Sequence, residues 1–227
     1  MIYAVILHFE SPLQSWGIDS RFQHRSAGSA PSKSAVCGMI CAACGAAKAS
    51  SDEADIIARF KHLKMDCFSI KGNGLMVDYH TIQNFRRATG KIDATGTVLT
   101  QRHYWQNSYF RVVLSSDDKD FIFRIYTALQ NPVWGIWLGR KCCIPAAPII
   151  REAPMEYSEA REKASHNFFE AFSEVEDFES GTDTWFDQPL GFGHAHSSGC
   201  EGRTYSPRRI NHYIPANSGD NGDFFCF

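Results

Sequence analysis

Short apolar runs and segments of helical periodicity alternate along the first part of the chain. Residues 2–10 form an almost continuous apolar run rich in β-forming residues, which predicts a buried strand at the start of the fold. Residues 31–48 place apolar side chains at helical spacing behind a proline and a serine, which are typical helix-start signals. A second helix is predicted over residues 51–63, because a serine and a glutamate near its start have the spacing of a capping box.

The following segments predict strands, a third helix and one more strand. Residues 65–70 and 75–83 are two β-like runs separated by an Asn-Gly pair, which favours a hairpin. Residues 98–115 predict a long strand, residues 117–129 a helix, and residues 133–138 a strand with two tryptophans. The order β-α-α-β-β-α-β predicts an α+β fold of the ferredoxin-like type.

Other segments depart from this pattern. Residues 84–96 are basic and poor in aliphatic side chains, so we expect a projecting loop there. We expect residues 1–150 to form the ferredoxin-like domain, and residues 151–227 to form an irregular, acidic and Gly-rich extension packed on the same domain. Within this extension, residues 158–171 predict a helix and residues 186–215 an irregular segment that could include an edge strand.

Composition excludes several classes of protein. The chain has 227 residues, of which 44% are hydrophobic, and this is enough for a sizeable core. No apolar run approaches the ~20 residues that a membrane span needs. The N-terminus lacks the basic region and the cleavage site of a signal peptide. We therefore expect a cytoplasmic protein with no membrane partner, whose eight cysteines are free thiols.

The charges are unevenly distributed, although the formal net charge is only −2. Residues 1–150 carry 17 basic and 11 acidic residues, whereas residues 151–227 carry 6 and 14. Such an asymmetry is typical of a protein with one surface that faces a polyanion. We expect segment 152–187, which has 11 acids and 2 bases, to lie away from any bound nucleic acid.

Cysteines and histidines offer a metal-binding alternative. Cys37, Cys41 and Cys44 share one face of a predicted helix, but their neighbours are apolar, and cysteine packs well as a small hydrophobic residue. His194 and His196 lie in a Gly/Ser-rich loop with no other ligand cluster nearby in the sequence. We predict no bound metal and no cofactor, with a small metal-binding regulator as the alternative. The common hydrolase and NTPase motifs are absent from the sequence.

Two short segments have features that bind phosphate. Residues 32–34 (Ser-Lys-Ser) begin the first predicted helix, where free N–H groups and the helix dipole attract anions. Residues 139–141 (Gly-Arg-Lys) follow a predicted strand, and glycine permits the close approach of a backbone. The alternatives are an ordinary capped helix with a solvated lysine and a strand-end turn with solvated charges.

Residues 79–111 combine cations with aromatic side chains. They contain five basic residues and a single acid, interleaved with histidine, phenylalanine, tyrosine and tryptophan. Cations neutralise phosphates and aromatic rings stack on splayed bases, so this mixture is typical of single-stranded RNA recognition. The alternative is a solvated hairpin in which Trp105 and Tyr109 belong to the core or to the base of the hairpin.

Seven segments of the chain, taken together, carry a resemblance to a known family. They are SPLQSWG, PSKSAVCGMICAACG, DYHTIQNFRRATGK, TQRHYWQNSYFRVVL, VWGIWLGRKCCIP, FDQPLGF and TYSPRRINHYIP. In this order they resemble the CasD-type family of subunits of type I-E CRISPR Cascade complexes. The resemblance runs through residues 1–150 and resumes near the end of the chain, whereas residues 152–187 match poorly.

This resemblance implies a RAMP fold, which is an RRM-like ferredoxin core with a projecting β-hairpin thumb at about residues 80–106. It implies a ribonucleoprotein subunit that binds and caps the 5′ handle of the crRNA in antiviral defence. It also implies contacts with the Cascade backbone subunit and large subunit, and with target DNA through the complex. The implied role is non-catalytic, because a separate endoribonuclease processes the RNA in this branch.

Candidate RNA-binding residues come from the loop after the first strand, the helix start, the thumb and the glycine-containing turn. We expect no catalytic residue among them. The candidates are Gln14, Trp16, Arg21, His24, Arg25, Ser32, Lys33, Ser34, His80, Thr81, Arg86, Arg87, Lys91, Gln101, Arg102, Tyr104, Gly139, Arg140 and Lys141.

Two alternative functions stay open at this stage. One is a metal-independent endoribonuclease that processes CRISPR repeat RNA, as a related subunit of type I-C systems does. Such an enzyme needs a general base near the 2′-OH and a cation for the leaving group, and Tyr79, His80, Lys91 and His103 offer these groups. The other is a stand-alone RNA-binding module without a protein interface.

Overall fold

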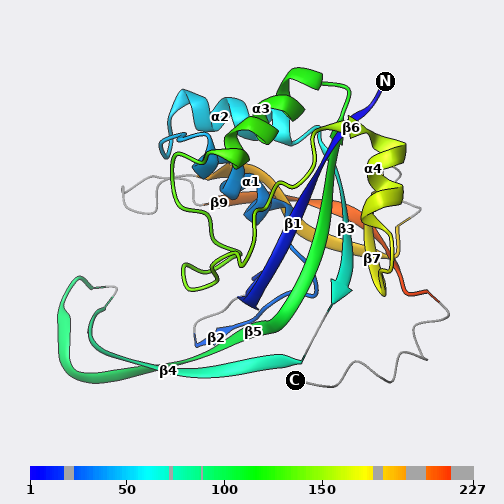
Figure 1. Ribbon diagram of the computed structural model, residues 1–227. Coiled ribbons are helices and arrows are strands. Elements are labelled where there is room, and N and C mark those ends of the chain that lie inside the picture. Colours follow the sequence, from blue (N-terminus) through cyan, green and yellow to red (C-terminus); the bar gives the residue numbers. More distant parts are fainter. Residues whose placement is uncertain (18–22, 72–73, 88, 176–180, 193–202, 216–227) are drawn as a thin grey trace.

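The computed structural model describes residues 1–17, 23–71, 74–87, 89–175, 181–192 and 203–215. Within these stretches, nine strands form one sheet and four α-helices pack around it (Figure 1). The predicted α+β class is confirmed. The strands are β1 (Tyr3–Gln14), β2 (His24–Arg25), β3 (Lys64–Lys71), β4 (Leu75–Arg86), β5 (Ile92–Ser116), β6 (Met155–Glu156), β7 (Glu170–Val175), β8 (Asp183–Phe192) and β9 (Arg203–Tyr213), and the helices are α1 (Lys33–Ala43), α2 (Ser51–Phe60), α3 (Lys119–Gln130) and α4 (Tyr157–Ala164).

Strand β5 is the centre of the sheet. The strand order is β6-β1-β5-β3-β7-β9-β8, and each pairing along this path is antiparallel. Two further strands pair with β5 beyond this path, β4 in antiparallel and β2 in parallel orientation. Strand β5, with its 25 residues, therefore connects the body of the protein to β4 and β2.

Strand β1 is apolar almost throughout because both of its faces are covered. Successive side chains of a strand point to opposite faces of the sheet. Val5 and Leu7 belong to the core that includes buried residues of α1, α2 and α3, whereas Ala4 and Ile6 pack against α4. Figure 1 shows α4 on the other side of the sheet from these three helices.

Helix α2 begins where its capping residue predicts. Ser50 precedes α2 and accepts a hydrogen bond from Glu53 N at 3.2 Å, as the capping-box spacing predicted. Helix α1 is shorter than the predicted 31–48. It ends at Ala43, and the chain then turns through Gly45, whose φ of +70° lies in the left-handed region.

The predicted hairpin between residues 65–70 and 75–83 is wrong. Strands β3 and β4 do not pair with each other; both pair with β5, one behind the other along its length. The turn residues 72–73 lie outside the described stretches. The hairpin partner of β4 is the N-terminal part of β5, so β4 and residues 92–105 of β5 form a two-stranded arm that projects from the body (Figure 1).

The predicted strand at residues 133–138 is also wrong. This segment is a loop, because its first N–H groups bond to the end of α1 and not to a neighbouring strand. Val133 N donates to Ala43 O at 3.0 Å and Trp134 N donates to Ala42 O at 3.2 Å. The sheet edge beside β1 is taken by the short strand β6.

The region after residue 151 is more regular than predicted. The helix expected over 158–171 ends at Ala164, and β7 follows it. The segment expected to be irregular, 186–215, provides most of β8 and all of β9, which extend the central sheet beyond β7. Acidic residues of β7 and β8 therefore lie next to the start of α1. Residues 216–227 of the expected extension lie outside the described residues.

Candidate nucleic-acid interface

A groove of about 800 Å³ opens beside α1, with β2 and the loop after α3 at its sides. Its lining includes four basic residues and one acid, Glu53, whose carboxylate accepts a hydrogen bond from Ala49 N at 2.7 Å. The lining therefore favours an anionic ligand. Six residues that the sequence predicted to bind RNA come together here from distant segments: Arg25, Ser32, Ser34, Arg102, Gly139 and Arg140.

The short strand β2 places Arg25 and Arg102 side by side, because these two residues are paired in the β2–β5 ladder. Arg25 is exposed, and no acceptor for its guanidinium is found among the described residues. Arg102 is half-buried and donates from Nε to Thr100 Oγ1 at 3.3 Å. His24 and Gln101 form the neighbouring pair of the ladder, and His24 is exposed. The guanidinium groups of these two arginines can bind phosphate.

Arg140 links β2 to β5 at the side of the groove. Its guanidinium donates to His103 O at 3.1 Å and to Arg25 O at 2.8 Å, and it lies 4.6 Å from the ring centroid of Tyr104. Tyr104 is 4% exposed, and burial together with a hydrogen bond from Cys142 raises its pKa. Both residues were predicted to contact RNA. Arg140 uses part of its hydrogen-bonding capacity on the protein backbone, and Tyr104 lies beneath it.

Gly139 has a structural reason to be glycine. Its φ is +98°, and a Cβ at this position would lie 1.8 Å from Ser15 O. The turn is fixed here because Ser15 N donates to Leu138 O at 3.1 Å. The sequence suggested that this glycine admits a phosphate; the structure shows instead the close approach of the backbone of β1 and its following loop. Lys141 beside it is exposed, with Nζ 5.9 Å from the ring centroid of Trp137.

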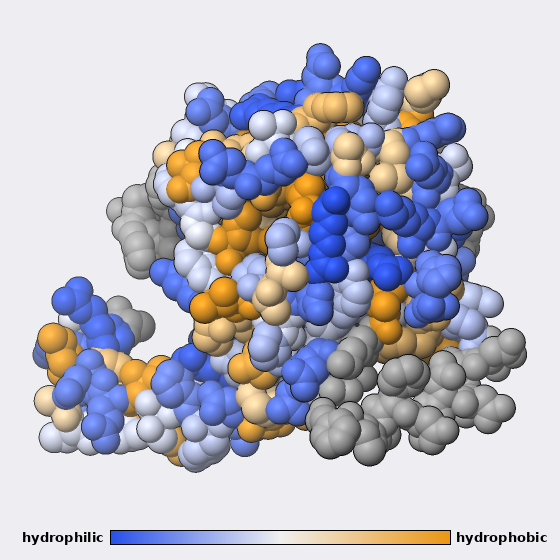
Figure 2. Space-filling model, viewed as in Figure 1, coloured by the Kyte–Doolittle hydropathy of each residue, from blue (hydrophilic) through white to orange (hydrophobic). Residues whose placement is uncertain are grey.

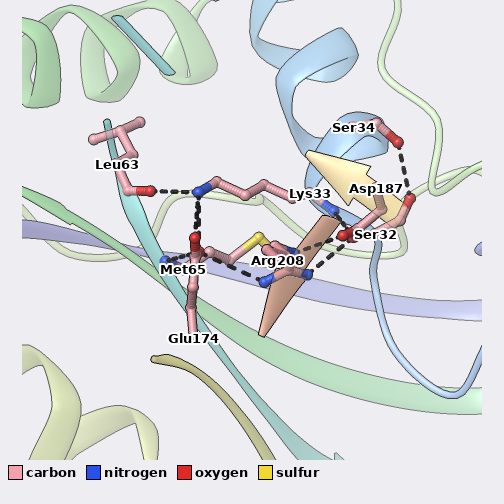
Figure 3. A network of polar contacts seen from close by, with 8 residues as sticks. All are labelled: Ser32, Lys33, Ser34, Leu63, Met65, Glu174, Asp187 and Arg208. Atoms are coloured by element: carbon pink, nitrogen blue, oxygen red, sulfur yellow. Dashed lines mark hydrogen bonds and ion pairs between the residues drawn. The ribbon is translucent and has the colours of Figure 1, made fainter. Parts of the chain in front are cut away.

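The side chain of Lys33 is not at the surface, so the expectation that its charge contacts RNA is wrong. It has 0% exposure, and Nζ donates to Leu63 O at 2.6 Å and to both carboxylate oxygens of Glu174 at 2.9 Å (Figure 3). Burial lowers the pKa of Lys33, and the charge of Glu174 opposes this shift. Lys33 therefore joins α1 to β7.

The start of α1 is already bound to an anion of the same chain. Asp187 of β8 accepts a hydrogen bond from Lys33 N at 2.7 Å, and Arg208 of β9 donates to the same carboxylate at 2.6 and 2.9 Å (Figure 3). Arg208 also lies 3.6 Å from Glu174, which closes a network of two cations and two anions. Asp187 thus occupies the first N–H of the helix, where a phosphate was expected. Ser32 is buried and Ser34 half-buried.

Gln14 and Trp16 are also buried, contrary to the expectation that they face the guide. Gln14 Nε2 donates to Phe9 O at 2.8 Å and to Ser108 O at 2.7 Å. Trp16 Nε1 donates to Gln14 Oε1 at 3.0 Å, and its ring packs against Phe9. The two residues fix the end of β1 beneath the groove.

The arm carries the other predicted contacts. Figure 2 shows it standing apart from the body, with hydrophilic and hydrophobic residues both exposed. His80 and Thr81 are exposed on β4, and Arg86, Arg87 and Lys91 are exposed near the tip. Arg87 forms an ion pair with Asp93, and its hydrogen bond lowers the pKa of that carboxyl. No partner of the Arg86 side chain is found among the described residues.

The residues of the endoribonuclease alternative do not converge. In the β4–β5 ladder, Val77 is opposite His103, and His80 is opposite Thr100. Paired residues share a face and successive residues alternate, so His103 and Tyr79 lie on one face of the arm and His80 on the other. Lys91 is beyond the paired strands, at the tip.

The cysteines of α1 and of its C-cap pack as predicted. Cys37 and Cys41 are 0% and 4% exposed within the main core, and Cys44 is half-buried. A hydrogen bond with Cys41, followed by burial, raises the pKa of Cys37. Within the described residues, no group of three or more His, Cys, Asp or Glu side chains is arranged to hold a metal ion. None of the helices described here is long and apolar enough to cross a membrane.

Sequence reasoning missed the aromatic side of the groove. Trp134 and Trp137 line it and are 45% and 38% exposed, and Tyr205 of β9 lines it as well. Lys48 is a further basic residue of the lining. The two tryptophans were predicted to lie in a strand. The proline before them and the glycine between them favour a loop instead. Arg21, another predicted contact, lies outside the described residues.

Comparisons with known proteins agree on one family. Residues 4–215 match the family Cas_Cas5d, described as CRISPR-associated protein (Cas_Cas5). The "CRISPR system Cascade subunit CasD" of Escherichia coli (strain K12) is 26% identical over 155 residues, which cover 64% of this chain and 69% of that protein. A chain of a "CRISPR RNA-guided surveillance complex" superposes with a TM-score of 0.73 and 25% identity, covering 93% of this chain and 89% of that one. The protein of a solved structure described as "Crystal structure of Cas protein" shares the fold. It superposes with a TM-score of 0.62 and 23% identity, covering 93% of this chain and 94% of that one.

Proposed function

Since this chain belongs to the Cas_Cas5d family of CRISPR-associated proteins, we propose that it is a subunit of a CRISPR RNA-guided surveillance complex that binds and caps the 5′ handle of the crRNA. The observation that carries this proposal is the convergence of Arg25, Arg102 and Arg140 on one groove. These residues are 38 to 115 positions apart in sequence. Because they line one groove, a single anionic ligand can contact all three. Single-stranded RNA fits because its phosphates need cations and its splayed bases need aromatic surfaces.

The fold supports the finer structural proposal of a RAMP domain. Strands β6, β1, β5 and β3 are adjacent in this order, and α1, α2 and α3 cover one face. We take this unit as an RRM-like ferredoxin core within residues 1–150, with β6 supplying the fourth strand from the segment that follows. The arm is the proposed thumb, and it starts at Leu75, earlier than the expected residue 80. The C-terminal strands pack on the same sheet as a structural extension of that domain.

We propose that the chain has no catalytic role. The support comes from the register of the arm, which places His80 and His103 on opposite faces. A general base and a cation for the leaving group must reach the same phosphodiester. The geometry of the arm therefore favours RNA binding over cleavage. The type I-E assignment and a cytoplasmic location belong to the same proposal.

The proposed partners are the crRNA, the backbone subunit and the large subunit of the complex, and target DNA through the assembly. The network of Lys33, Glu174, Asp187 and Arg208 neutralises two acids of the segment 152–187 inside the protein. Other acids of this segment lie on α4, on the sheet face away from α1. We expect that face to contact solvent or a protein partner, not the guide. An RNA crosslink that maps to α4 would refute this placement.

The test is a binding assay with labelled cognate repeat RNA in EDTA, with and without the other complex subunits. We expect intact RNA that shifts tightly only when the other subunits are present. In the assembled complex, Arg25→Ala with Arg102→Ala should weaken guide binding by about 100-fold or more, because two charge-assisted hydrogen bonds are lost. The slope of log affinity against log salt should fall by about 1.4, which is about 0.7 for each phosphate contact to a single strand.

Arg124→Ala is the matched control. Arg124 is exposed on α3 and forms an ion pair with Asp55 at 3.3 Å, outside the lining of the groove. It should leave both the affinity and the salt slope unchanged. Equal losses from both variants, or a discrete cleavage product made by the chain alone, would overturn the proposal.

The arm makes a separate prediction. Arg86→Ala should weaken guide binding more than Arg87→Ala, because the charge of Arg87 is already paired with Asp93. The double variant should lower guide retention without changing the urea midpoint of the body, since both side chains are exposed. Retention of guide at the wild-type level by the double variant would show that the arm is not the thumb.

A further inference from the structure

We propose that the loop 133–138 forms a stacking site for one unstacked base of the bound RNA, with the indole rings of Trp134 and Trp137 as its platform. The inference deepens the proposed function and rests on it, because the base would belong to the same single strand whose phosphates meet the arginines. Both rings are only partly buried: 45% of the Trp134 surface and 38% of the Trp137 surface are exposed.

Exposure of both tryptophans is the first argument. Large aromatic side chains are usually buried, and an exposed group of them marks an interaction surface. Phe123 is similarly exposed on α3, but it lies outside this groove. The two tryptophans share one concave surface with Tyr205 and with four basic residues, so aromatic rings and positive charges meet in the same place.

The rigidity of the loop is the second argument. Its beginning is bonded to the end of α1 by Val133 N and Trp134 N. Its end is bonded on both sides, since Leu138 O accepts from Ser15 N at 3.1 Å and Leu138 N donates to Cys143 O at 2.8 Å. A loop fixed at both ends presents its side chains without an ordering cost when the ligand binds.

Gly135 makes room for one of the rings. A Cβ on Gly135 would lie 2.8 Å from Cζ2 of Trp137, so the indole ring rests directly on this glycine. The ammonium group of Lys141 lies 5.9 Å from the centroid of the same ring. The ring therefore packs on a glycine of its own loop and contributes its exposed surface to the groove.

The chemistry of the lining selects the ligand. Arginines recognise phosphate, and indole rings stack on any base because each base has a π-face. An apolar protein segment would bring no anion to the four basic residues of the lining, and only one acid lies among them. A single-stranded nucleotide satisfies both the aromatic rings and the cations.

The experiment uses the reconstituted complex and guides in which one handle nucleotide at a time is replaced by 2-aminopurine or by an abasic residue. One 2-aminopurine position should be quenched in the wild type and restored in Trp137→Ala. Trp137→Ala should weaken guide binding by about 5- to 150-fold, and Trp137→Phe should recover part of this loss. An abasic residue at the quenched position should weaken wild-type binding by a similar factor and leave Trp137→Ala unaffected.

Two further variants separate the possible reasons for a loss. Gly135→Ala retains both indole rings but displaces that of Trp137, and it should reproduce the loss of quenching. Phe123→Ala removes an equally exposed ring elsewhere and should bind guide as the wild type does. Guide binding that is insensitive to Trp134→Ala and Trp137→Ala, with the arginine variants still impaired, would overturn the stacking site alone. Failure of the wild-type complex to bind the handle would overturn the proposed function.

Discussion

Asp187→Asn should lower the free energy of unfolding by about 3–5 kcal/mol, which is the typical cost of breaking a buried ion pair. Asp187 is 2% exposed and accepts three hydrogen bonds, two from Arg208 and one from Lys33 N. Asparagine has the same shape, but its amide group would face the Arg208 guanidinium, which is itself only 7% exposed. The substitution leaves a buried cation without its main partner and weakens the cap of α1.

The measurement is urea unfolding followed by tryptophan fluorescence, with the midpoint and the slope fitted together. Asp183→Asn is the matched control, because Asp183 is exposed on the same strand and should change stability by less than about 0.5 kcal/mol. The alternative interpretation, in which the start of α1 is open to RNA phosphate, predicts the opposite result. Removal of a negative charge there would then tighten guide binding and leave the stability unchanged.

This network also shows what the sequence could not reveal. Ser-Lys-Ser before an apolar helix has the local features of a phosphate site, and local features were all that the pattern offered. The partners of Lys33 are 141 and 154 residues away in Glu174 and Asp187. Their segment was predicted to be acidic and to lie away from any bound nucleic acid, and charge counts say nothing about which side chains pair in the core.

Elements fixed by local chemistry were predictable. Strand β1 follows from its apolar run, and α2 follows from its capping box. The loop 133–138 has the composition of a strand, yet long-range hydrogen bonds to the last turn of α1 decide its conformation. The Asn-Gly pair before β4 likewise favours a hairpin, but the length of β5 allows β3 and β4 to share one partner. Tertiary contacts thus overrode local preference at both places.

The candidate site shows the same division. The sequence identified residue types that bind RNA, and the groove does bring Arg25, Arg102 and Arg140 together. It could not separate residues that line the groove from residues that support it, because burial depends on neighbours far along the chain. Trp16 is the clearest example, since an aromatic residue in a polar loop resembles a stacking residue and is in fact 0% exposed.

Gly139→Ala should destabilise the protein by about 2–5 kcal/mol, from two causes that act together. A left-handed backbone costs an alanine about 1–2 kcal/mol, and overpacking of a fixed site costs typically 1–3 kcal/mol. The new Cβ would meet Ser15 O at 1.8 Å, and this is a backbone atom that cannot rotate away. The turn must therefore move, and it would carry Arg140 away from His103 O and Arg25 O.

Gly90→Ala separates the two causes. Gly90 has a φ of +81°, but a Cβ added there would meet no atom within 4 Å, so only the conformational cost of about 1–2 kcal/mol applies. Urea unfolding should rank Gly139→Ala well below Gly90→Ala in stability. Guide binding by the folded fraction should fall in Gly139→Ala, because the turn positions Arg140 at the groove. Equal stability of the two variants would mean that Ser15 and Gly139 are farther apart in solution, and the turn would then be free to approach RNA, as the sequence alone suggested.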